Sequence, residues 1–488
     1  MKPPKATHAQ ARQLIDAATR GEIDEAGARQ LYQLGIEVVM LALVASAKRV
    51  AQLQARVAQL EGRSPAAGDA TRPSPSTPSA MQPVYQKGNR ARGRKRRPGA
   101  RNGHAGTRRA QPERIDRVEE HRAPCCPDCG GPLQRCQRKR SRIIEDIPEH
   151  IEPVVTEHVV HRDYCAKCKK HVEPVVPDAL PRATLGHHVV ALTSWLHYGL
   201  GVTIERIVDI FSYHLHTRVT PGGLVDMWRR LAEILVEWYD QIAAEARAST
   251  HLHADETGWR VGGATWWLWC FTNSRNCYYM IDRNRGSPAL QKFFTDCFEG
   301  VLITDFWRAY DSVCADGRQF CLVHLLRELE NVDEHNESLE WRAFSKTLRR
   351  LIRDAIRLRK RPDFTPQRYV SRVQCIDRRL CDLADAGHTD ADAKRLADRL
   401  SRTRDHLWTF LDEPEVTFDN NFAERQIRPA VLLRKNGQNN RSERGAAVQS
   451  ILMSVYRTLR LRGHNPMQTI ASALRTYIAT GTLPPLPA

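Results

Sequence analysis

The chain has 488 residues, 13 of them Cys, with 74 Lys and Arg against 56 Asp and Glu and a formal net charge of +18. A length of this size predicts roughly two to four domains at about 100–200 residues each. A content of 41% hydrophobic and 27% charged residues excludes a wholly disordered or collagen-like chain. The longest apolar run, residues 38–45, is too short for a membrane helix of ~20 residues.

The N-terminus lacks the apolar core of a secretory signal, so we expect an intracellular, reducing environment. In that environment the cysteines are expected to be metal ligands and core thiols and not a disulfide framework. The excess of positive charge favours a polyanionic partner.

A heptad pattern predicts that residues 1–62 form a helical segment that dimerises. The a positions are Ile36, Leu43, Val50 and Val57, and the d positions are Val39, Ser46, Leu53 and Leu60. Branched a residues with Leu at the later d positions favour a parallel two-stranded coiled coil, and hence a homodimer or higher assembly. The alternative is an amphipathic helix packed on its own chain.

Residues 63–115 are predicted to be a disordered linker and a basic tract. The first part is rich in Pro, Ser, Ala and Thr, which cannot bury enough apolar surface to order itself. Residues 86–110 then contain ten Lys and Arg and no acid. Such a tract is expected to contact DNA phosphates without reading sequence. The candidate contacts at its centre are Arg94, Lys95, Arg96 and Arg97.

Residues 116–180 are predicted to form a zinc ribbon that binds DNA. Two Cys-x-x-Cys pairs, Cys126 with Cys129 and Cys165 with Cys168, flank apolar alternating runs at 141–147 and 151–164 that predict strands. Four thiolates satisfy tetrahedral Zn²⁺, although the gap between the pairs is longer than usual. A redox pair is the alternative for a single Cys-x-x-Cys, and Cys125 and Cys136 are further thiols that could compete as ligands.

Residues 181–247 are predicted to be helical. Thr203 is placed to cap one helix, and Thr220 followed by Pro221 to start a second with an apolar face. Two successive helices are similar to a helix-turn-helix, whose second helix could lie in a major groove. The connection is longer than that motif usually has, so a plain helical connector is an equal alternative.

Residues 248–440 carry the pattern of a catalytic domain. Strands are predicted at 251–261, 264–273 and 275–283, with the Gly262-Gly263 dipeptide forming a hairpin turn, then a short helix at 287–298 and a strand ending at Asp305. This order predicts a ribonuclease-H-like mixed sheet with helices on its faces. Asp255 on the first strand and Asp305 at the end of the fourth would then emerge side by side.

Two neighbouring carboxylates are costly unless a cation neutralises them. Mg²⁺, or Mn²⁺ in its place, suits an oxygen-only site beside phosphate, and a pair of ions about 3.5–4 Å apart would support in-line displacement at phosphorus. A third acid, Glu424, lies on a predicted helix that Asp419 or Asn420 could cap. Glu256 and Asp311 are near enough in sequence to be alternatives for the first two acids.

The helix that carries Glu424 also carries basic residues suited to gripping a DNA phosphate. They are Arg425, Arg428, Arg434 and Lys435. Glu424 and Arg428 share a face at i,i+4 spacing, so an ordinary ion pair within the helix is the alternative for this acid.

The motifs resemble those of the IS66 family of bacterial insertion-sequence transposases. The matching phrases occur in the family's order and are CPDCGG, EDIP, YCAKC, HADETGWRV, ITDFWRAYD, CLVHLLREL, DNNFAERQIRPAVLLRKN and RSERGAAVQSILMSVYRTLRLRGHNP. The resemblance implies a DDE transposase whose acids fall on Asp255, Asp305 and Glu424. The family usually has an aromatic residue where this chain has Leu322, and Gly-Tyr where it has Phe306-Trp307.

The resemblance also places the family's Cys-x-x-His phrase on Cys321 and His324, which we interpret as positioning or core residues and not as a second zinc site. Residues from about 325 to 415 are Arg-rich and predicted to be a helical insertion that supports DNA or folds back on the core. Residues 441–488 are predicted to be a C-terminal helical region. The fold class is therefore a multidomain α+β or α/β protein: coiled coil, zinc ribbon, helical region and ribonuclease-H-like core with a helical insertion.

The implied function is binding to the terminal inverted repeats of a mobile genetic element, followed by metal-dependent strand cleavage and strand transfer. The implied partners are transposon-end and target DNA, a second copy of the chain and accessory proteins encoded by the same element, in the bacterial cytoplasm at the nucleoid. Two alternatives are an inactive transposase-derived DNA-binding protein and a ribonuclease-H-like nuclease that cuts without joining.

Overall fold

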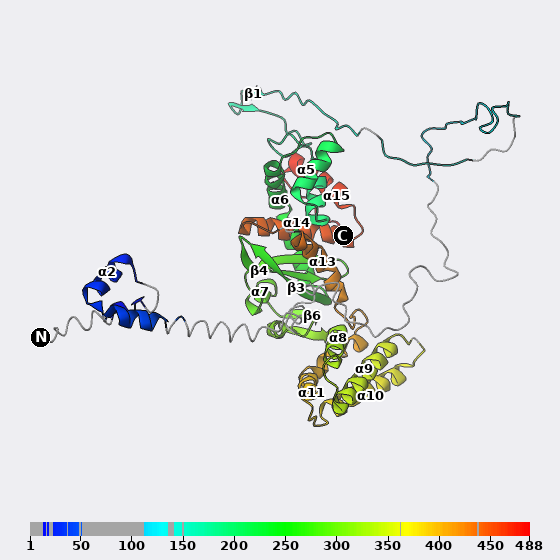
Figure 1. The fold of residues 1–488 in the computed structure, drawn as a ribbon. Coiled ribbons are helices and arrows are strands. Elements are labelled where there is room, and N and C mark those ends of the chain that lie inside the picture. The colour runs from blue at the N-terminus through cyan, green and yellow to red at the C-terminus, as the bar shows by residue number, and fades with distance from the viewer. Residues whose placement is uncertain are drawn as a thin grey trace. The chain divides into compact units, whose positions relative to one another are not determined.

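The computed structural model describes residues 13–15, 17–18, 23–36, 38–47, 50, 112–134, 141–148, 151–361, 363–436 and 439–488. The chain divides into two compact units, Met1–Pro75 and Ser76–Ala488, and each is described by itself (Figure 1). The basic tract with Arg94, Lys95, Arg96 and Arg97 lies outside the described residues. None of the described helices is both long and apolar enough to cross a lipid bilayer.

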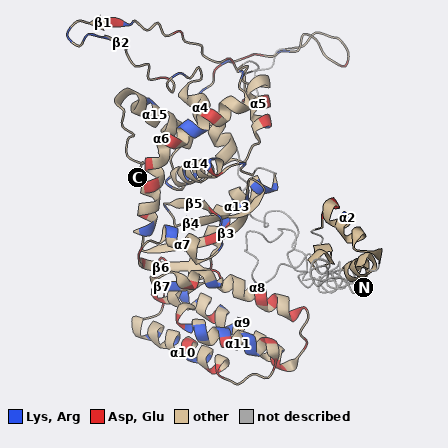
Figure 2. Cartoon of the chain, turned by 90° about the vertical axis from the view of Figure 1, so that its left-hand side faces the viewer, with Lys and Arg blue, Asp and Glu red and all other residues tan. Residues whose placement is uncertain are grey.

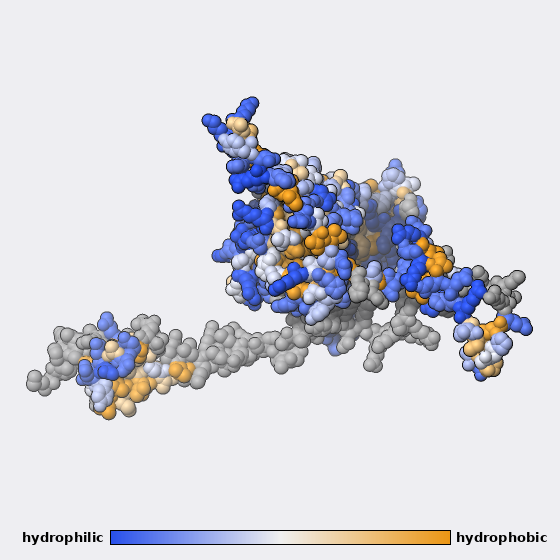
Figure 3. All heavy atoms as spheres, turned by 90° about the horizontal axis from the view of Figure 1, so that it is seen from above, coloured by the Kyte–Doolittle hydropathy of each residue, from blue (hydrophilic) through white to orange (hydrophobic). Residues whose placement is uncertain are grey.

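The described part of the N-terminal unit is helical. Helix α2 spans Glu25–Gln33, and the Asp24 carboxylate caps it by accepting a hydrogen bond from the Gly27 N–H at 2.8 Å. Residues 38–47 are also helical. Apolar side chains gather on one side of this unit (Figure 3), and Ile36 and Leu43, at heptad a positions, are 76% and 61% exposed. The later heptads, 51–62, lie outside the described residues, so the coiled coil stays a prediction.

Residues 112–180 contain little regular structure among those described. A short antiparallel hairpin pairs β1 (Asp163–Cys165) with β2 (Lys170–Val172). The strands predicted at 141–147 and 151–164 are wrong except for the last residues of the second run. No strand among the described residues pairs with these runs, and Ile147 and Val154 are 78% and 93% exposed.

A five-stranded mixed sheet forms the centre of the second unit, in the order β5-β4-β3-β6-β7. The strands are β3 (His251–Val261), β4 (Ala264–Thr272), β5 (Cys277–Asp282), β6 (Phe298–Thr304) and β7 (Ala315–Phe320). The predicted strand order from β3 to β6 is confirmed, and helix α7 (Ser287–Phe293) precedes β6 as predicted. Gly262 and Gly263 turn the β3–β4 hairpin with φ of +56° and +81°, which residues without a Cβ adopt at least cost.

Helices from two distant parts of the chain form two layers over one face of this sheet. They are α4 (His187–Ser194), the π-helix η2 (Trp195–Gly199), α5 (Ile204–Tyr213), α6 (Pro221–Arg247), α13 (Asn421–Lys435), α14 (Glu443–Leu461) and α15 (Pro466–Thr480). Of these, α6, α13 and α14 contact the strands, and the others pack on these three helices. Thr203 and Thr220 cap α5 and α6 as predicted. All of these helices contribute to one hydrophobic core with β3, β4 and β5. Figure 2 shows α14 and α13 next to the sheet and α4, α5 and α15 farther from it. The predicted helical region and C-terminal region therefore pack together on the sheet.

The opposite face and one end of the sheet are covered separately. Helix α7 packs on the opposite face in a core rich in Phe. A 3-10 turn, Arg308–Ser312, lies between β6 and β7. The part of the chain predicted to be a helical insertion contains α8 (Leu322–Asp333), α9 (Leu339–Arg359), α10 (Pro366–Ala384), α11 (Ala391–Thr403) and α12 (Thr409–Asp412), with a 3-10 turn at Arg404–His406. Its core includes Val301, Ile303 and Phe320 of the sheet, so the insertion and the sheet share one hydrophobic interior.

One cysteine pair departs from the expectation of free thiols. Cys297 and Cys314 form a disulfide with Cα atoms 4.6 Å apart. These residues immediately precede β6 and β7, and parallel neighbours that begin side by side bring them together. The other described cysteines are free.

Candidate active site

The first predicted acid, Asp255, lies in the middle of β3 and is 2% exposed. It is directly opposite Cys270 of β4, so both side chains lie on the sheet face that α13 and α14 cover. Its Oδ1 accepts a hydrogen bond from the Glu256 N–H at 2.9 Å. Burial raises the pKa of Asp255 well above its ordinary value, and nearby carboxylates raise it further. Those carboxylates are Glu256, Asp305 and Glu424.

The second predicted acid, Asp305, follows the last residue of β6. Strands β3 and β6 are parallel, and His253 lies opposite Ile303. Asp255 and Asp305 are each two residues further along, so they emerge at the same edge of the sheet. Burial and the charge of Glu256 raise the pKa of Asp305 to about 6. The Trp307 N–H donates a 2.9 Å hydrogen bond to Asp305 Oδ1 and orients it.

The third predicted acid, Glu424, lies in the first turn of α13. Asn420, just before that helix, ties it to the strand of the first acid: its Nδ2 donates to the Ala254 carbonyl at 2.8 Å, and its Oδ1 lies 3.0 Å from His253 Nδ1. Asn420 makes no side-chain cap hydrogen bond to the helix itself. Its role is therefore to fix α13 against β3, which brings Glu424 to Asp255.

Cys321 and His324, the Cys-x-x-His phrase, lie at the start of α8 and are close to Asn420 and Glu424. The Asn420 N–H donates to Cys321 Sγ at 3.1 Å, and the Leu322 N–H donates to the Phe418 carbonyl at 2.9 Å. Burial raises the pKa of Cys321 to about 12, so this thiol stays protonated near neutral pH. His324 Nε2 lies 3.7 Å from Glu424 Oε1. The interpretation of Cys321 as a positioning residue agrees with these contacts, and His324 lies among the acids.

Arg327, one helical turn after His324, pairs with Glu424: Nη1 donates to Oε1 at 3.2 Å, and Nη2 donates to Oε2 at 3.4 Å. Sequence reasoning had considered Arg428 as the partner of Glu424 on the same helix. The actual partner comes from α8, almost one hundred residues earlier, and only the packing of α8 against α13 reveals it. The pair neutralises part of the negative charge that the three acids bring together.

Glu256 and Asp311, the alternatives for the first two acids, have different surroundings from Asp255 and Asp305. Glu256 is fully buried on the opposite sheet face, where Oε1 pairs with Arg285 at 3.1 Å and Oε2 accepts a 2.7 Å hydrogen bond from the Tyr310 hydroxyl. Arg285 itself stacks over the Trp307 ring at 3.9 Å. Asp311 is 61% exposed and lies 3.5 Å from Arg318. Glu256 is thus held by partners of its own, and Asp311 faces solvent.

Within the described ranges, no three or more His, Cys, Asp or Glu side chains are arranged so that they could hold a metal ion in this structure. The donors near Asp255 nevertheless fit a divalent cation chemically. Burial and the neighbouring carboxylates raise the pKa of Asp255, and burial and Glu256 raise the pKa of Asp305, so a cation would relieve the cost of ionising both acids. The ring nitrogens of His324, which make no hydrogen bond to any described residue, add a further donor there.

The four candidate zinc ligands form two separate turns. The Gly130 N–H donates to the Cys126 carbonyl at 2.8 Å, and the Cys168 N–H points to Cys165 Sγ at 3.4 Å. Backbone N–H groups lower the pKa of Cys126, those of Asp128 and Cys129 among them. Backbone N–H groups that point to sulfur favour thiolates, as a metal knuckle requires. The absence of a closed cluster applies to these described cysteines too, so zinc binding stays a prediction.

The candidate DNA contacts on α13 are not equivalent. Arg425, Arg428 and Lys435 are exposed. Arg434 instead points into the protein, where Nη1 donates to Thr257 Oγ1 at 2.7 Å and to the Gly258 carbonyl at 2.6 Å. Burial lowers the pKa of Arg434. These hydrogen bonds hold α13 against β3, and they use Nη1 of the Arg434 guanidinium.

Comparison with known proteins settles the family. The family model described as Transposase IS66 family matches residues 182–448. The chain belongs to the IS66 transposase family. The matched range of this IS66 family member contains Asp255, Asp305 and Glu424, and it ends before most of α14.

Relatives of this IS66 family member occur in Sinorhizobium fredii. The uncharacterized protein y4jD is 22% identical over 416 residues, which cover 76% of this chain and 78% of y4jD. The uncharacterized protein y4hP is 23% identical over 397 residues, which cover 72% of this chain and 70% of y4hP. The similarity thus extends well beyond the matched family range.

Proposed function

We propose that this IS66 family member is a DNA transposase that cleaves and joins DNA strands, with Asp255, Asp305 and Glu424 as its catalytic acids. The observation that carries the proposal is their convergence: β3, the end of β6 and the first turn of α13 bring them together although the first and last are 169 positions apart. Asn420 and Arg327 hold the third acid in place.

The sheet supports a ribonuclease-H-like core. Three antiparallel strands are followed by two parallel ones in the order β5-β4-β3-β6-β7; Asp255 lies on β3, and Asp305 directly follows β6, the parallel neighbour of β3. The acids would hold a divalent cation, Mg²⁺ or Mn²⁺, which when bound supplies Lewis-acid stabilisation of charge at phosphorus. Exposed Arg425 and Arg428 on α13 would hold neighbouring phosphates.

In the first step, a water oxygen would attack phosphorus in line as the bond to the 3′ oxygen breaks, leaving a 3′-hydroxyl and a 5′-phosphate. In the second, the oxygen of that 3′-hydroxyl would attack the phosphorus of a target phosphodiester as the bond from this phosphorus to the target's own 3′ oxygen breaks, and the target strand would leave with a 3′-hydroxyl. Asp305, oriented by the Trp307 N–H, and Asp255, oriented by the Glu256 N–H, keep fixed positions through both steps. Fixed charged groups of this kind lower the reorganisation cost of the reaction.

A basic face on α9 supports DNA as the substrate. Residues 339–361 contain nine Lys and Arg against two acids. At spacings of three and four residues, five exposed cations lie on one face, Arg342, Lys346, Arg350, Arg353 and Arg357. In the described part of the chain none of the five has an acidic partner, and they extend over about 22 Å of helix. A row of this length matches a DNA backbone that carries one charge every ~1.7 Å.

The proposal also gives roles to the regions that precede the catalytic domain. The cysteine turns would hold Zn²⁺ and, together with the helical region 181–247 and the basic tract, position the terminal inverted repeats of the element. The N-terminal helices would pair two copies of the chain so that both ends are held together. The exposed apolar side of the N-terminal unit supports that pairing.

The test uses the full chain and DNA that carries the inverted repeats flanking its coding region. We expect Asp255→Asn to retain binding of this DNA and to lose cleavage in Mg²⁺ or Mn²⁺. Asp311→Asn is the matched control, because it removes an exposed acid six residues after Asp305, and it should retain both activities. Cleavage by Asp255→Asn at the wild-type rate, or none by the wild type, would contradict the proposal.

A further inference from the structure

The segment after β6 that carries Asp305 is held from the sheet face opposite Asp255. Glu256 follows Asp255 in β3, so its side chain lies on that other face, where it is fully buried. Its Oε2 accepts the 2.7 Å hydrogen bond from the hydroxyl of Tyr310, in the 3-10 turn that begins three residues after Asp305. Glu256 therefore anchors the far end of this segment.

Arg285 connects Glu256 to the near end of the same segment. Its Nε and Nη2 donate to Glu256 Oε1 at 3.2 and 3.1 Å, and its guanidinium carbon lies 3.9 Å from the centroid of the Trp307 ring. The Trp307 N–H in turn donates to Asp305 Oδ1 at 2.9 Å. A chain of contacts thus leads from the buried Glu256 carboxylate, through a guanidinium and an aromatic ring, to the second acid.

The loop that carries Arg285 is itself fixed. It connects β5 with α7, and the Trp269 Nε1–H donates to the Asn284 carbonyl in this loop at 3.2 Å. The guanidinium of Arg285 also lies over the Trp267 ring at 4.7 Å, and the side chain is 19% exposed. An arginine that is restrained by a buried acid and two aromatic rings is a rigid support, because its planar guanidinium stacks and pairs in one orientation.

The Trp307 ring contributes its face and not its polar atom. Its Nε1 is buried and makes no hydrogen bond to any described residue, although buried N–H groups normally have a partner. The contact that the ring does make is with the guanidinium of Arg285, which lies over its face.

We propose that Arg285 is a positioning residue for Asp305: anchored on Glu256, it holds the Trp307 ring so that the Trp307 N–H keeps the Asp305 carboxylate beside Asp255. This inference rests on the proposed transposase function. Two successive residues of β3 then serve the site from opposite faces, Asp255 as an acid and Glu256 as the anchor of the segment that carries the other acid. The charge of Arg285 acts in the same direction, because burial and Glu256 raise the pKa of Asp305 and Arg285 lowers it.

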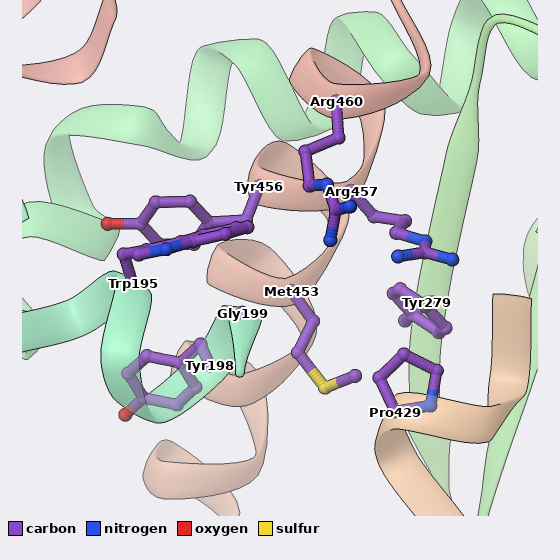
Figure 4. Close-up of a pocket in the computed structure, with 9 residues that line it drawn as sticks. All are labelled: Trp195, Tyr198, Gly199, Tyr279, Pro429, Met453, Tyr456, Arg457 and Arg460. Atoms are coloured by element: carbon purple, nitrogen blue, oxygen red, sulfur yellow. The ribbon is translucent and has the colours of Figure 1, made fainter. Parts of the chain in front are cut away.

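Helix α13, which carries the third acid, is held by different contacts and serves as an internal reference. Figure 4 shows the Tyr279 ring next to Pro429 of α13 and Arg457 of α14. The Tyr279 hydroxyl donates to the Gln426 carbonyl at 2.5 Å, and Arg457 Nε donates to the Gln426 side chain. These contacts do not involve Arg285, so a change at Arg285 should leave α13 in place.

Hydrogen exchange tests the chain of contacts without DNA or metal. Arg285→Lys keeps a positive charge beside Glu256 and removes the flat guanidinium that stacks on Trp307. In the full chain in EDTA, the Trp307 amide should exchange about 2- to 30-fold faster than in the wild type, the range for loss of one cation–π contact. Peptides of α13 should keep the wild-type rate. An unchanged rate at Trp307, or an equal rise at Trp307 and in α13, would overturn the proposal.

Arg283→Lys is the matched control for the arginine. Arg283 likewise lies over a tryptophan ring, Trp266 at 5.0 Å, and pairs with an acid, Glu443. The same substitution removes the same chemistry from a different set of residues, so exchange at Trp307 should keep the wild-type rate. Equal increases in Arg283→Lys and Arg285→Lys would overturn the proposal.

Two changes at Trp307 separate its ring from its backbone. Trp307→Ala and Trp307→Phe both keep the backbone N–H that donates to Asp305. Trp307→Ala should speed exchange as Arg285→Lys does, because no ring is left for the guanidinium to hold. Trp307→Phe retains an aromatic face and should return the exchange rate toward the wild-type value. Slow exchange in Trp307→Ala would also overturn the proposal.

Cleavage of inverted-repeat DNA measures the consequence for the reaction. Arg285→Lys should bind this DNA with wild-type affinity and cleave it about 10–100-fold more slowly in Mn²⁺, the usual effect of losing an outer partner of a metal ligand. Arg283→Lys should cleave at the wild-type rate. Cleavage by Arg285→Lys at the wild-type rate would exclude the positioning role.

The inference and the proposed function fail separately. Cleavage by the wild type, together with unchanged exchange at Trp307 in Arg285→Lys, would exclude the positioning role and leave the transposase activity standing. Faster exchange at Trp307 in Arg285→Lys, with no cleavage by the wild type, would exclude the activity and leave the support of Asp305 standing.

Discussion

The imidazole of His324 lies 3.7 Å from the carboxylate of Glu424, and both of its ring nitrogens are buried without a hydrogen-bond partner among the described residues. In the proposed transposase, a ring at this position beside three acids would support the cation that those acids hold. The same ring approaches Asp305 closely enough that its charge would lower the pKa of that acid.

His324→Ala is therefore expected to reduce DNA cleavage by about 10–100-fold, the usual effect of losing a group that supports a metal ligand. Binding of inverted-repeat DNA should not change, and the Mn²⁺ concentration that gives half-maximal cleavage should rise. His388→Ala is the control, because His388 lies 3.4 Å from Glu340 in the insertion, away from the acids. Equal losses in the two variants would indicate a general effect on folding.

Asp255→Asn should stabilise the protein even though it removes cleavage. Burial and three neighbouring carboxylates raise the pKa of Asp255, so its ionised form is unfavourable in the folded chain without a cation. Asparagine keeps an oxygen to accept the Glu256 N–H and removes the charge. We expect the free energy of unfolding in EDTA to rise by about 0.5–2 kcal/mol, measured by urea denaturation. Asp311→Asn, at an exposed site, should stay within about 0.5 kcal/mol of wild type, and a fall for Asp255→Asn would contradict the argument.

The central strands and the first two acids were predictable because their signals are local. Alternating apolar residues and the Gly262-Gly263 turn mark β3 and β4, and an acid at the end of an apolar strand marks Asp305. Strand β7 was not predicted, since only its last two residues are fully buried and its sequence is mostly polar. The runs at 141–147 and 151–164 show the converse: apolar alternation makes a strand only where another strand covers it.

The contacts that position Glu424 could not be predicted in the same way. Asn420 reaches Ala254 and Cys321 across 166 and 99 residues, and Arg327 reaches Glu424 across 97. These pairs depend on how α8 and α13 pack against β3, and no pattern within either helix encodes that packing. The motif phrase around Glu424 led to the prediction of this residue as the third acid, whereas the residues that contact it emerged only from the fold.

The basic face of α9 predicts a specific salt dependence of DNA binding. Changing Arg342, Lys346 and Arg350 to Gln removes three exposed cations without an acidic partner in the described chain. If each neutralises one phosphate, the slope of log K against log salt should become shallower by about 2.7 for duplex DNA, at about 0.9 per contact. The slope is measured by fluorescence anisotropy over a range of NaCl concentrations.

The matched control for α9 removes the same charge from the other helices of the insertion. Arg372 and Arg378 of α10 and Lys394 of α11 are likewise exposed, and their change to Gln should leave the slope near the wild-type value. If both triple variants change the slope equally, α9 has no dedicated contact and the protein's net charge alone accounts for the effect.

His197 predicts how stability depends on pH. Its ring stacks on Trp228 with 4.8 Å between centroids, Nδ1 lies 2.9 Å from the Val202 carbonyl, and burial lowers the pKa of His197. Below the ordinary pKa of about 6.5, the unfolded chain binds a proton that folded His197 does not. The free energy of unfolding therefore falls as pH falls below about 6.5, by up to about 1.4 kcal/mol per pH unit for this one group.

His197→Phe keeps the stacking on Trp228 and removes the titrating group. The free energy of unfolding, measured by urea denaturation between pH 7 and 5, should therefore depend less steeply on pH in this variant. The Val202 carbonyl loses its hydrogen-bond partner, which lowers stability at every pH. His214→Phe, at an exposed position, should retain the wild-type slope; an unchanged slope in His197→Phe would assign the acid sensitivity to the other buried histidines.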